Sequence, residues 1–326
     1  MLLIVVLDVE HVFEKLGMRK FTYLCVVYGK AGKALPKMHS SNKVKLGFGS
    51  LLNPSNNEES MEIVMLGTGY AMAERCYNTC FALVNGEEAL LVDAGGGNQI
   101  FGQLAKAGIP YENIRAMFIT HAHTDHILGA IWLVRKMAAL IHKKSYTPPF
   151  HIYCHEEAAD ALLQICRLTL PAKFIREFGE TIILHTVGEG DTASVAGMEL
   201  TFFDIHSTKL KQFGFRSLLP DGKRLAFLGD EPYNPECRRF VENSDWLLCE
   251  AFCRYEDREI FHPYEKHHST VRDAGTIAGK LGVKNLLLYH TEDRSLDSRK
   301  ESYTAEAKSV FGGNVYVPYD LERIRL

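Results

Sequence analysis

Residues 119–130 read ITHAHTDHILGA, and most of what the sequence says about chemistry starts from them. The apolar run RAMFIT comes directly before three histidines and an aspartate. In an extended turn, alternate side chains point the same way, so His121 and His123 can hold one metal ion. Asp125 and His126 follow at the start of a helical pattern and can reach a second ion. These donors favour Zn²⁺, with Mn²⁺ or Fe as alternatives. A surface histidine cluster, or histidines that cap a helix, is the competing interpretation.

The composition is that of a soluble globular protein. The 326 residues are 46% hydrophobic and 24% charged, with a formal net charge of −3, so nothing attracts the whole chain to nucleic acid or a membrane. The eight cysteines form no CxxC pair, which indicates reduced thiols and a cytoplasmic protein. The N-terminal apolar run stops at Asp8, too early to span a bilayer, so we expect no membrane contact.

Changes in composition along the chain predict two parts. Residues 29–60 are rich in Gly, Ser, Asn, Lys and Pro, so we expect residues 1–60 to be an N-terminal extension and linker, in part poorly ordered. Whether Met61 is the true start stays open. Over residues 61–326, short strand-like runs alternate with helical patterns. These patterns lie near 97–107, 126–141, 155–167, 269–281 and 303–310. The alternation predicts an α/β domain with mixed sheets and helices packed outside.

Three further candidate ligands follow apolar strand-like runs downstream. His206 follows LTFFDI, Asp230 ends RLAFLGD, and His290 ends NLLLYH. Strand ends are the usual place for active-site residues in α/β folds. Taken singly, each has another interpretation: a loop histidine, a turn residue after Gly229, and a helix cap. Asp93 in LLVDAGGG is expected to accept a hydrogen bond from a ligand imidazole and fix its tautomer.

The segment HAHTDH resembles the HxHxDH signature of the metallo-β-lactamase superfamily. VMLGTGYA (64–71) and LLVDAGGG (90–97) look like the opening of its ribonuclease Z (tRNase Z) branch and the smaller phosphodiesterase relatives. The resemblance covers residues 61–326. It implies a four-layer αβ/βα sandwich with two mixed β-sheets, and a metal site at the edge between the sheets.

The resemblance also implies how the ligands divide between two metal ions. One ion would take His121, His123, His206 and Asp230, and the other Asp125, His126, Asp230 and His290. Two ions about 3.5–4 Å apart lower the pKa of a shared water and hold a hydroxide between them at neutral pH. That chemistry is hydrolysis, and it leaves open which bond is hydrolysed.

The segment KHHST (266–270) resembles the His-Ser-Thr motif of the ribonuclease Z group. There the histidine protonates the leaving oxygen and is oriented by a glutamate from a HEAT motif, whose counterpart here is CEAF. The resemblance therefore implies that His268 is the general acid and that Glu250 orients it. With Asp125, these are the expected catalytic residues. The alternative is that His268 only caps the helix at 269–281.

Two departures from the ribonuclease Z pattern bear on the substrate. That family commonly inserts a long tRNA-clamping arm between the third histidine ligand and the bridging aspartate, whereas His206 and Asp230 are only 24 positions apart. The HEAT counterpart has also lost its His and Thr. We therefore expect a small phosphodiester, such as a cyclic nucleotide, a nucleotide diester or a short oligonucleotide, and not full tRNA. Homodimers are common in the family, but no stretch of this sequence demonstrates one.

Three other functions stay open. The same fold could hydrolyse a carbon ester, thioester or lactone. It could hold a single iron as an oxidoreductase, like the persulfide dioxygenases. It could also be a non-catalytic binding module. Since ligands for both ions are present and His268 with Glu250 suits phosphorus chemistry, the dinuclear phosphodiesterase is the leading interpretation.

Overall fold

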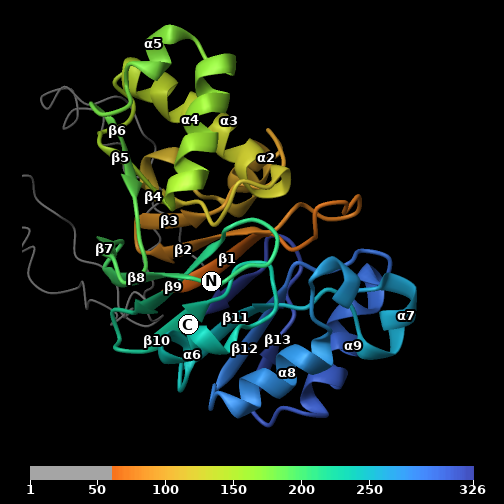
Figure 1. Cartoon of the computed structure of the whole chain (residues 1–326). Helices are drawn as coiled ribbons and strands as arrows, with labels where there is room; N and C mark the ends of the chain where they lie inside the picture. The colour runs from red at the N-terminus through yellow and green to blue at the C-terminus, as the bar shows by residue number, and fades with distance from the viewer. Residues whose placement is uncertain (1–60) are drawn as a thin grey trace, which may run out of the picture. The chain divides into compact units, whose positions relative to one another are not determined.

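The computed structural model describes residues 61–326, which form two β-sheets packed face to face between helices (Figure 1). The predicted extension and linker at 1–60 lies outside the described residues. The first sheet has the order β14-β1-β2-β3-β4-β5-β6 and the second β13-β12-β11-β10-β9-β8-β7. Strands of the first sheet are β1 (Glu62–Gly67), β2 (Cys80–Asn85), β3 (Glu88–Val92), β4 (Ile114–Phe118), β5 (Phe150–Cys154), β6 (Ile182–Thr186) and β14 (Arg323–Arg325). Strands of the second are β7 (Thr192–Val195), β8 (Met198–Asp204), β9 (Phe213–Leu218), β10 (Arg224–Phe227), β11 (Trp246–Glu250), β12 (Asn285–Tyr289) and β13 (Asn314–Tyr316).

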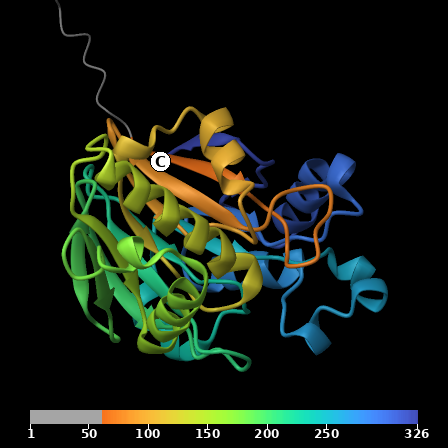
Figure 2. The ribbon, with the colours of Figure 1, turned by 90° about the horizontal axis from the view of Figure 1, so that it is seen from above.

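Helices cover the outer face of each sheet. Those of the first half lie over the orange strands of the first sheet (Figure 2) and are α2 (Ile100–Ala107), α3 (Thr124–His142), α4 (Glu156–Thr169) and α5 (Ala172–Ile175). In the second half, the sheet is covered by α6 (Arg238–Val241), α8 (Val271–Lys280) and α9 (Leu296–Lys308), and α7 (Arg258–Phe261) lies to one side (Figure 1). Short 3₁₀ turns are η2 (Tyr111–Asn113), η3 (Pro235–Cys237), η4 (Tyr255–Asp257) and η5 (Tyr264–Lys266). No helix among residues 61–326 is both long and apolar enough to cross a bilayer.

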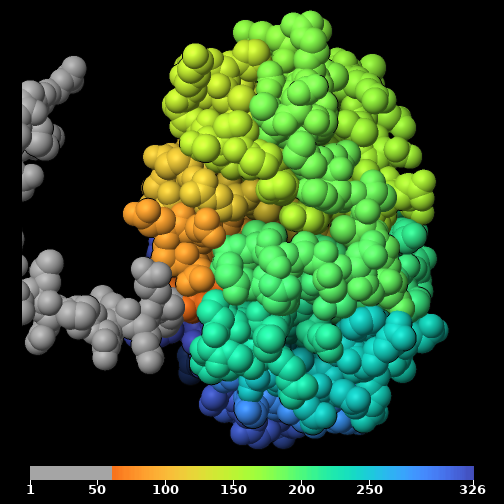
Figure 3. Space-filling model, turned by 90° about the vertical axis from the view of Figure 1, so that its left-hand side faces the viewer, coloured from red at the N-terminus to blue at the C-terminus, as the bar shows by residue number. Residues whose placement is uncertain are grey.

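Three buried apolar clusters show how the layers are joined. One lies between the first sheet and α2, α3 and α4, and another between the second sheet and α6, α8 and α9. The third lies between the sheets, where Phe118 of β4 packs against Phe202 of β8 and Phe215 of β9. In Figure 3, which shows one outer face, the residues coloured orange to yellow lie above those coloured teal to blue. The predicted four-layer sandwich is confirmed.

Both sheets are mixed, as predicted, and their parallel strands bring strand ends to a common edge. β3, β4, β5 and β6 run parallel in the first sheet, and β10, β11, β12 and β13 in the second. The carboxyl ends of parallel strands lie side by side, so residues that follow β10, β11 and β12 gather there. The backbone N–H of Phe213 donates to the carbonyl of Thr120, which ties the end of β4 to the second sheet.

Candidate metal centre

The histidine motif lies in the short loop between β4 and α3. His123 is the N-cap residue of α3, with an extended backbone, and Asp125 lies in the first helical turn. The start of α3 approaches the loop after β3 closely: Gly129 donates its N–H to Gly95, and a Cβ at Gly129 would lie 1.8 Å from the Ala94 carbonyl oxygen. Glycine at this position therefore allows α3 to sit where its first turn faces the strand ends.

Three buried imidazoles converge on the carboxylate of Asp230, which follows β10. The Asp230 Oδ2 atom lies 3.7 Å from His121 Nε2, 3.5 Å from His126 Nε2 and 3.6 Å from His290 Nε2. The Asp125 carboxylate lies 3.2 Å from His126 Nε2. Two overlapping groups have ligand atoms within 4.8 Å of one another: His121, His126 and Asp230, and Asp125, His126 and His290. The donors that the sequence places at three separate strand ends thus meet in one cluster.

Two of the predicted ligands stand apart from this cluster. The His123 Nδ1 atom lies 2.8 Å from His121 Nε2, so His123 is adjacent to the cluster although it belongs to neither group. The His206 imidazole is 3.6 Å from the Glu236 carboxylate and about one third exposed. The structure therefore gathers five of the seven predicted ligands, and His206, which lies beside Glu236, is outside both groups.

Hydrogen bonds behind the cluster orient two of its imidazoles. Asp93 accepts from His126 Nδ1 at 2.7 Å, which is the hydrogen bond predicted for it. It also accepts from the Thr120 hydroxyl at 2.8 Å, so the Thr120 oxygen is free to accept from His121 Nδ1, also at 2.8 Å. Both imidazoles then carry a proton on Nδ1 and direct Nε2 at the cluster, the ring orientation that binds a metal ion.

Sequence reasoning missed two of the residues that support the centre. Thr120 joins Asp93 to His121, and the fully buried Gln212 accepts the backbone N–H of Asp230 at 3.3 Å. Thr120 directly precedes the histidine motif, so its position could have been noticed. Gln212 lies in the loop between β8 and β9, and nothing in the sequence around it marks a link to Asp230.

The cluster fits a bound metal ion by the chemistry of its atoms. His126 Nε2, Asp230 Oδ1 and His290 Nδ1 are buried and have no hydrogen-bond partner. Buried polar groups are nearly always paired, so unpartnered atoms on three residues of this cluster fit a site that binds an ion. Imidazole nitrogens and carboxylate oxygens are donors that Zn²⁺ accepts.

Burial and mutual attraction set the charges of these groups. Burial lowers the pKa of His121 well below its usual value and lowers the pKa of His290 to about 3, so both are neutral at pH 7. Burial alone would raise the pKa of Asp230, but the nearby imidazoles, first His121, hold it well below its usual value. Burial would lower the pKa of His126, but the Asp125 and Asp93 carboxylates raise it well above its usual value. The cluster therefore offers two neutral imidazoles and ionised carboxylates, and His126 would release a proton when a metal ion binds.

The predicted acid and its orienting glutamate lie side by side. The His268 Nδ1 atom is 3.5 Å from Glu250 Oε2, and neither atom has another partner. The His268 ring stacks on Phe252 and has its centroid 5.2 Å from that of His290. A separation of 3.5 Å is too long for a good hydrogen bond, although catalytic contacts often shorten only when substrate binds.

His268 does not cap helix α8. The N-cap residue is Thr270, whose side chain accepts from the Asp273 N–H while the Asp273 carboxylate accepts from the Thr270 N–H. This capping box satisfies the first turn of the helix without an imidazole. The alternative that His268 only caps the helix is therefore wrong. Its imidazole takes no part in the hydrogen bonds of the cap.

His151 and His185, the two other histidines near predicted strands, belong to a separate pair. Their ring nitrogens lie 2.9 Å apart, across the neighbouring strands β5 and β6. Neither belongs to the groups around Asp230. This supports the interpretation that they are structural.

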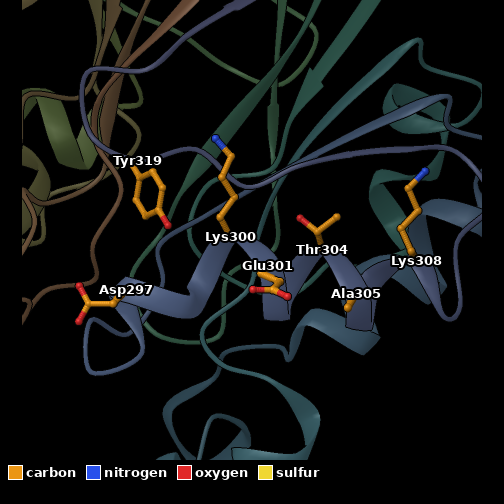
Figure 4. A pocket seen from close by; sticks show the side chains of 7 residues that line it. All are labelled: Asp297, Lys300, Glu301, Thr304, Ala305, Lys308 and Tyr319. Atoms are coloured by element: carbon orange, nitrogen blue, oxygen red, sulfur yellow. The ribbon is translucent and has the colours of Figure 1, made fainter.

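A cavity of about 310 Å³ is lined by His206 and His268, and another of about 340 Å³ is also lined by His206. A larger hollow of about 600 Å³ lies on the outer face of α9 (Figure 4). Two of its charged residues are paired elsewhere, Asp297 with Arg75 and Lys300 with Glu322. We therefore read the α9 hollow as a solvated helix face, unconnected with the cluster.

Comparisons with known proteins agree with this fold. A family model described as "Anti-Pycsar protein Apyc1" matches residues 61–309. A ribonuclease Z of Exiguobacterium sibiricum is 30% identical over 295 residues, covering 77% of this chain and 95% of the relative. The solved structure of YhfI, a metallo-β-lactamase fold protein of Bacillus subtilis, has a TM-score of 0.64 at 21% identity, over 82% of this chain and all of that one. Human tRNase Z, short form, has a TM-score of 0.63 at 20% identity, over 81% and 98%.

The fold and these likenesses define a metal-dependent hydrolase of the metallo-β-lactamase superfamily, in the ribonuclease Z-like branch of phosphodiesterases. The resemblance seen in the sequence is confirmed. Within this class, the chain belongs to the family described as Anti-Pycsar protein Apyc1.

Proposed function

We propose that the protein is a dinuclear metal-dependent phosphodiesterase that acts on a small phosphodiester. The observation that carries this proposal is the position of Asp230, whose carboxylate faces His121, His126 and His290 at 3.5–3.7 Å. A single carboxylate between two sets of donors is suited to serve two ions at once. In this proposal one ion is held by His121, His123, His206 and Asp230, and the other by Asp125, His126, Asp230 and His290.

Two divalent ions, when bound, would activate a water and polarise the phosphoryl oxygens. The chain's own residues supply the rest. Asp93 and Thr120 hold the imidazoles in the tautomer that faces the ions. His268 turns Nδ1 toward Glu250, which leaves Nε2 to donate a proton to the leaving oxygen as the P–O bond breaks. Such a proton matters because an alkoxide is a poor leaving group.

The size of the substrate is argued from the segment between His206 and Asp230. It contains only a loop, β9, a turn at residues 219–223 and β10. Nothing in it has the length of an arm that could clamp a folded RNA. The proposed substrates are therefore cyclic nucleotides, nucleotide diesters or short oligonucleotides.

The first test combines metal counting with turnover. Protein purified without added metal should contain two metal ions per chain and should hydrolyse bis-p-nitrophenyl phosphate faster than p-nitrophenyl esters. The variant His268→Ala should retain its metal and lose most turnover, while His142→Ala, a half-exposed histidine near the end of α3, should behave like the wild type. A single iron without phosphodiester turnover would overturn the proposal and favour the oxidoreductase. Faster hydrolysis of the carbon esters would favour the ester hydrolase.

A further inference from the structure

The cavity beside His268 has a composition suited to a flat ring. It holds about 310 Å³, the lower end of the range for small-molecule sites, which suits a ligand of mononucleotide size. Its walls combine aromatic and proline side chains with a few polar groups. The lining residues outside the proposed ligand and acid are Thr208, Glu231, Pro232, Tyr233, Asn234, Pro235, Tyr264 and His267.

Tyr264 presents an exposed aromatic side chain that is nevertheless held in place. It is 52% exposed, yet its hydroxyl donates to the Asp273 carboxylate at 2.8 Å. Asp273 is itself fixed by the capping box of α8. The backbone carbonyl of Tyr264 accepts from His267, and His268 donates to Pro263 in the same turn. Tyr264 is therefore positioned in advance, in the segment that joins α7 to α8 and carries His268 (Figure 1).

Polar contacts join the walls of this cavity. The Thr208 hydroxyl lies 2.8 Å from His267 Nδ1, which links the loop after β8 to the segment before α8. The buried Glu231 carboxylate accepts from the Ser207 hydroxyl and from the Thr208 N–H. The Lys209 ammonium donates to the carbonyl of Lys266 at 3.2 Å. Three segments distant in sequence thus form a preorganised pocket whose side chains lose little freedom on binding.

We propose that this cavity binds the base of the nucleoside whose oxygen leaves, with the base stacked on Tyr264. The inference rests on the proposed function, because His268 lines the cavity and a group that protonates the leaving oxygen must lie beside the alcohol it releases. A nucleobase has the π-face that a fixed tyrosine can stack on, whereas a glycerol or alkyl alcohol has none. The enzyme would therefore select nucleoside phosphodiesters by the leaving side of the substrate.

The test compares two substrates that differ only in the base. The first is a cyclic nucleoside monophosphate, assayed in two forms whose base is adenine or uracil. The second is the matching cyclic phosphate of methyl riboside, which has no base. Tyr264→Ala should lower kcat/KM for the cyclic nucleotides about tenfold, mainly through KM, because stacking on an aromatic side chain is lost. It should leave the base-free substrate unchanged. Tyr264→Phe, which keeps the ring, should retain most of the activity, and Trp132→Ala on α3 should match the wild type.

A binding measurement separates this inference from the proposed function. Calorimetry of a nucleoside monophosphate with wild type and Tyr264→Ala should show a Kd about tenfold weaker in the variant. Equal losses on both substrates, or an unchanged Kd, would overturn the role of Tyr264 while leaving the phosphodiesterase intact. Wild-type protein that hydrolyses neither substrate, nor bis-p-nitrophenyl phosphate, would overturn the function itself. Thermal unfolding of each variant checks that the fold is retained.

Discussion

Asp230 shows how much a single side chain depends on its surroundings. Its carboxylate is 3% exposed, faces three imidazoles, and keeps one oxygen without a partner. Its position after an apolar run made it predictable, as did the motif HAHTDH for His121 and His126. The orientation of His206 was not predictable. Its φ of +57° and its approach to Glu236 arise from tertiary contacts that no local pattern encodes.

His206 is the proposed ligand that metal counting tests best. If His206 serves the first ion, His206→Ala should reduce that ion's occupancy and leave the second ion in place, because the second set of donors is untouched. Metal analysis after equilibrium dialysis measures this directly. His123→Ala is the matched variant at the same ion and should give a similar loss. Full occupancy in His206→Ala would remove this residue from the ligand set.

We predict that replacement of Glu250 lowers activity and leaves the metal content unchanged. Glu250→Gln should reduce kcat about tenfold to a hundredfold, since His268 would lose the charge that orients its Nδ1–H. Metal content and KM should stay close to wild type. Ser269→Ala is the control. The Ser269 hydroxyl donates a hydrogen bond to the other Glu250 oxygen, so this substitution removes one contact and keeps the Glu250 carboxylate. A parallel loss of metal in Glu250→Gln would point to a structural role instead.

At the scale of elements, the sequence predicted helices correctly where apolar residues recur on one face of the helix. The patterns near 97–107, 126–141 and 155–167 correspond to α2, α3 and α4. The pattern at 303–310 was placed too late, because α9 spans Leu296–Lys308. The sequence of α9 is highly charged, and its buried face is built from Arg299, Tyr303 and Ala307. Arg299 is fully buried and donates to Thr68 and Thr291, and no apolar pattern marks such a residue.

A substitution in helix α3 tests the close approach of this helix to the loop after β3. Gly129→Ala should destabilise the fold by about 1–3 kcal/mol and weaken metal binding, because the new Cβ would meet the Ala94 carbonyl. Gly102→Ala is the matched control: nothing lies within 4 Å of that Cβ, so a change between neutral and about 1 kcal/mol of stabilisation is expected. Denaturant unfolding measures both. Equal stabilities would contradict the close approach of α3.

The histidine pair between β5 and β6 should make stability depend on pH. Burial lowers the pKa of both His151 and His185, so the unfolded chain binds more protons than the folded chain once pH falls below the unfolded pKa of about 6.5. The free energy of unfolding should therefore fall between pH 7 and pH 5. Unfolding at several pH values should show a shallower slope for the double variant His151→Phe, His185→Phe. An unchanged slope would assign the effect to the buried cluster histidines alone.

At the scale of the whole molecule, the candidate centre joins the two halves of the sandwich. His121, Asp125 and His126 come from the end of β4 and the start of α3 in the first half, whereas Asp230 and His290 follow β10 and β12 in the second. The two-sheet architecture could be predicted because the motif resembles a known family. The pairing of individual residues across the halves could not, since it depends on how the sheets pack.

Removal of metal should therefore weaken the whole fold. A ligand that binds only the folded state, at a hundredfold excess over its Kd, stabilises that state by about 3 kcal/mol, so a chelator should lower the free energy of unfolding by a similar amount. Readdition of Zn²⁺ should restore it. Denaturant unfolding with and without chelator measures the difference. Identical curves would show that the donors do not cross-link the halves through a bound ion.

The same division of donors has a consequence for biosynthesis. The first donor is residue 121 and the last is residue 290 of 326, so most of the polypeptide must leave the ribosome before a complete coordination sphere exists. Metal loading would then be a late event, possible only after the sheets have docked. The metal-to-protein ratio of a preparation would report what fraction of molecules matured correctly, and could rank expression conditions before any substrate is known.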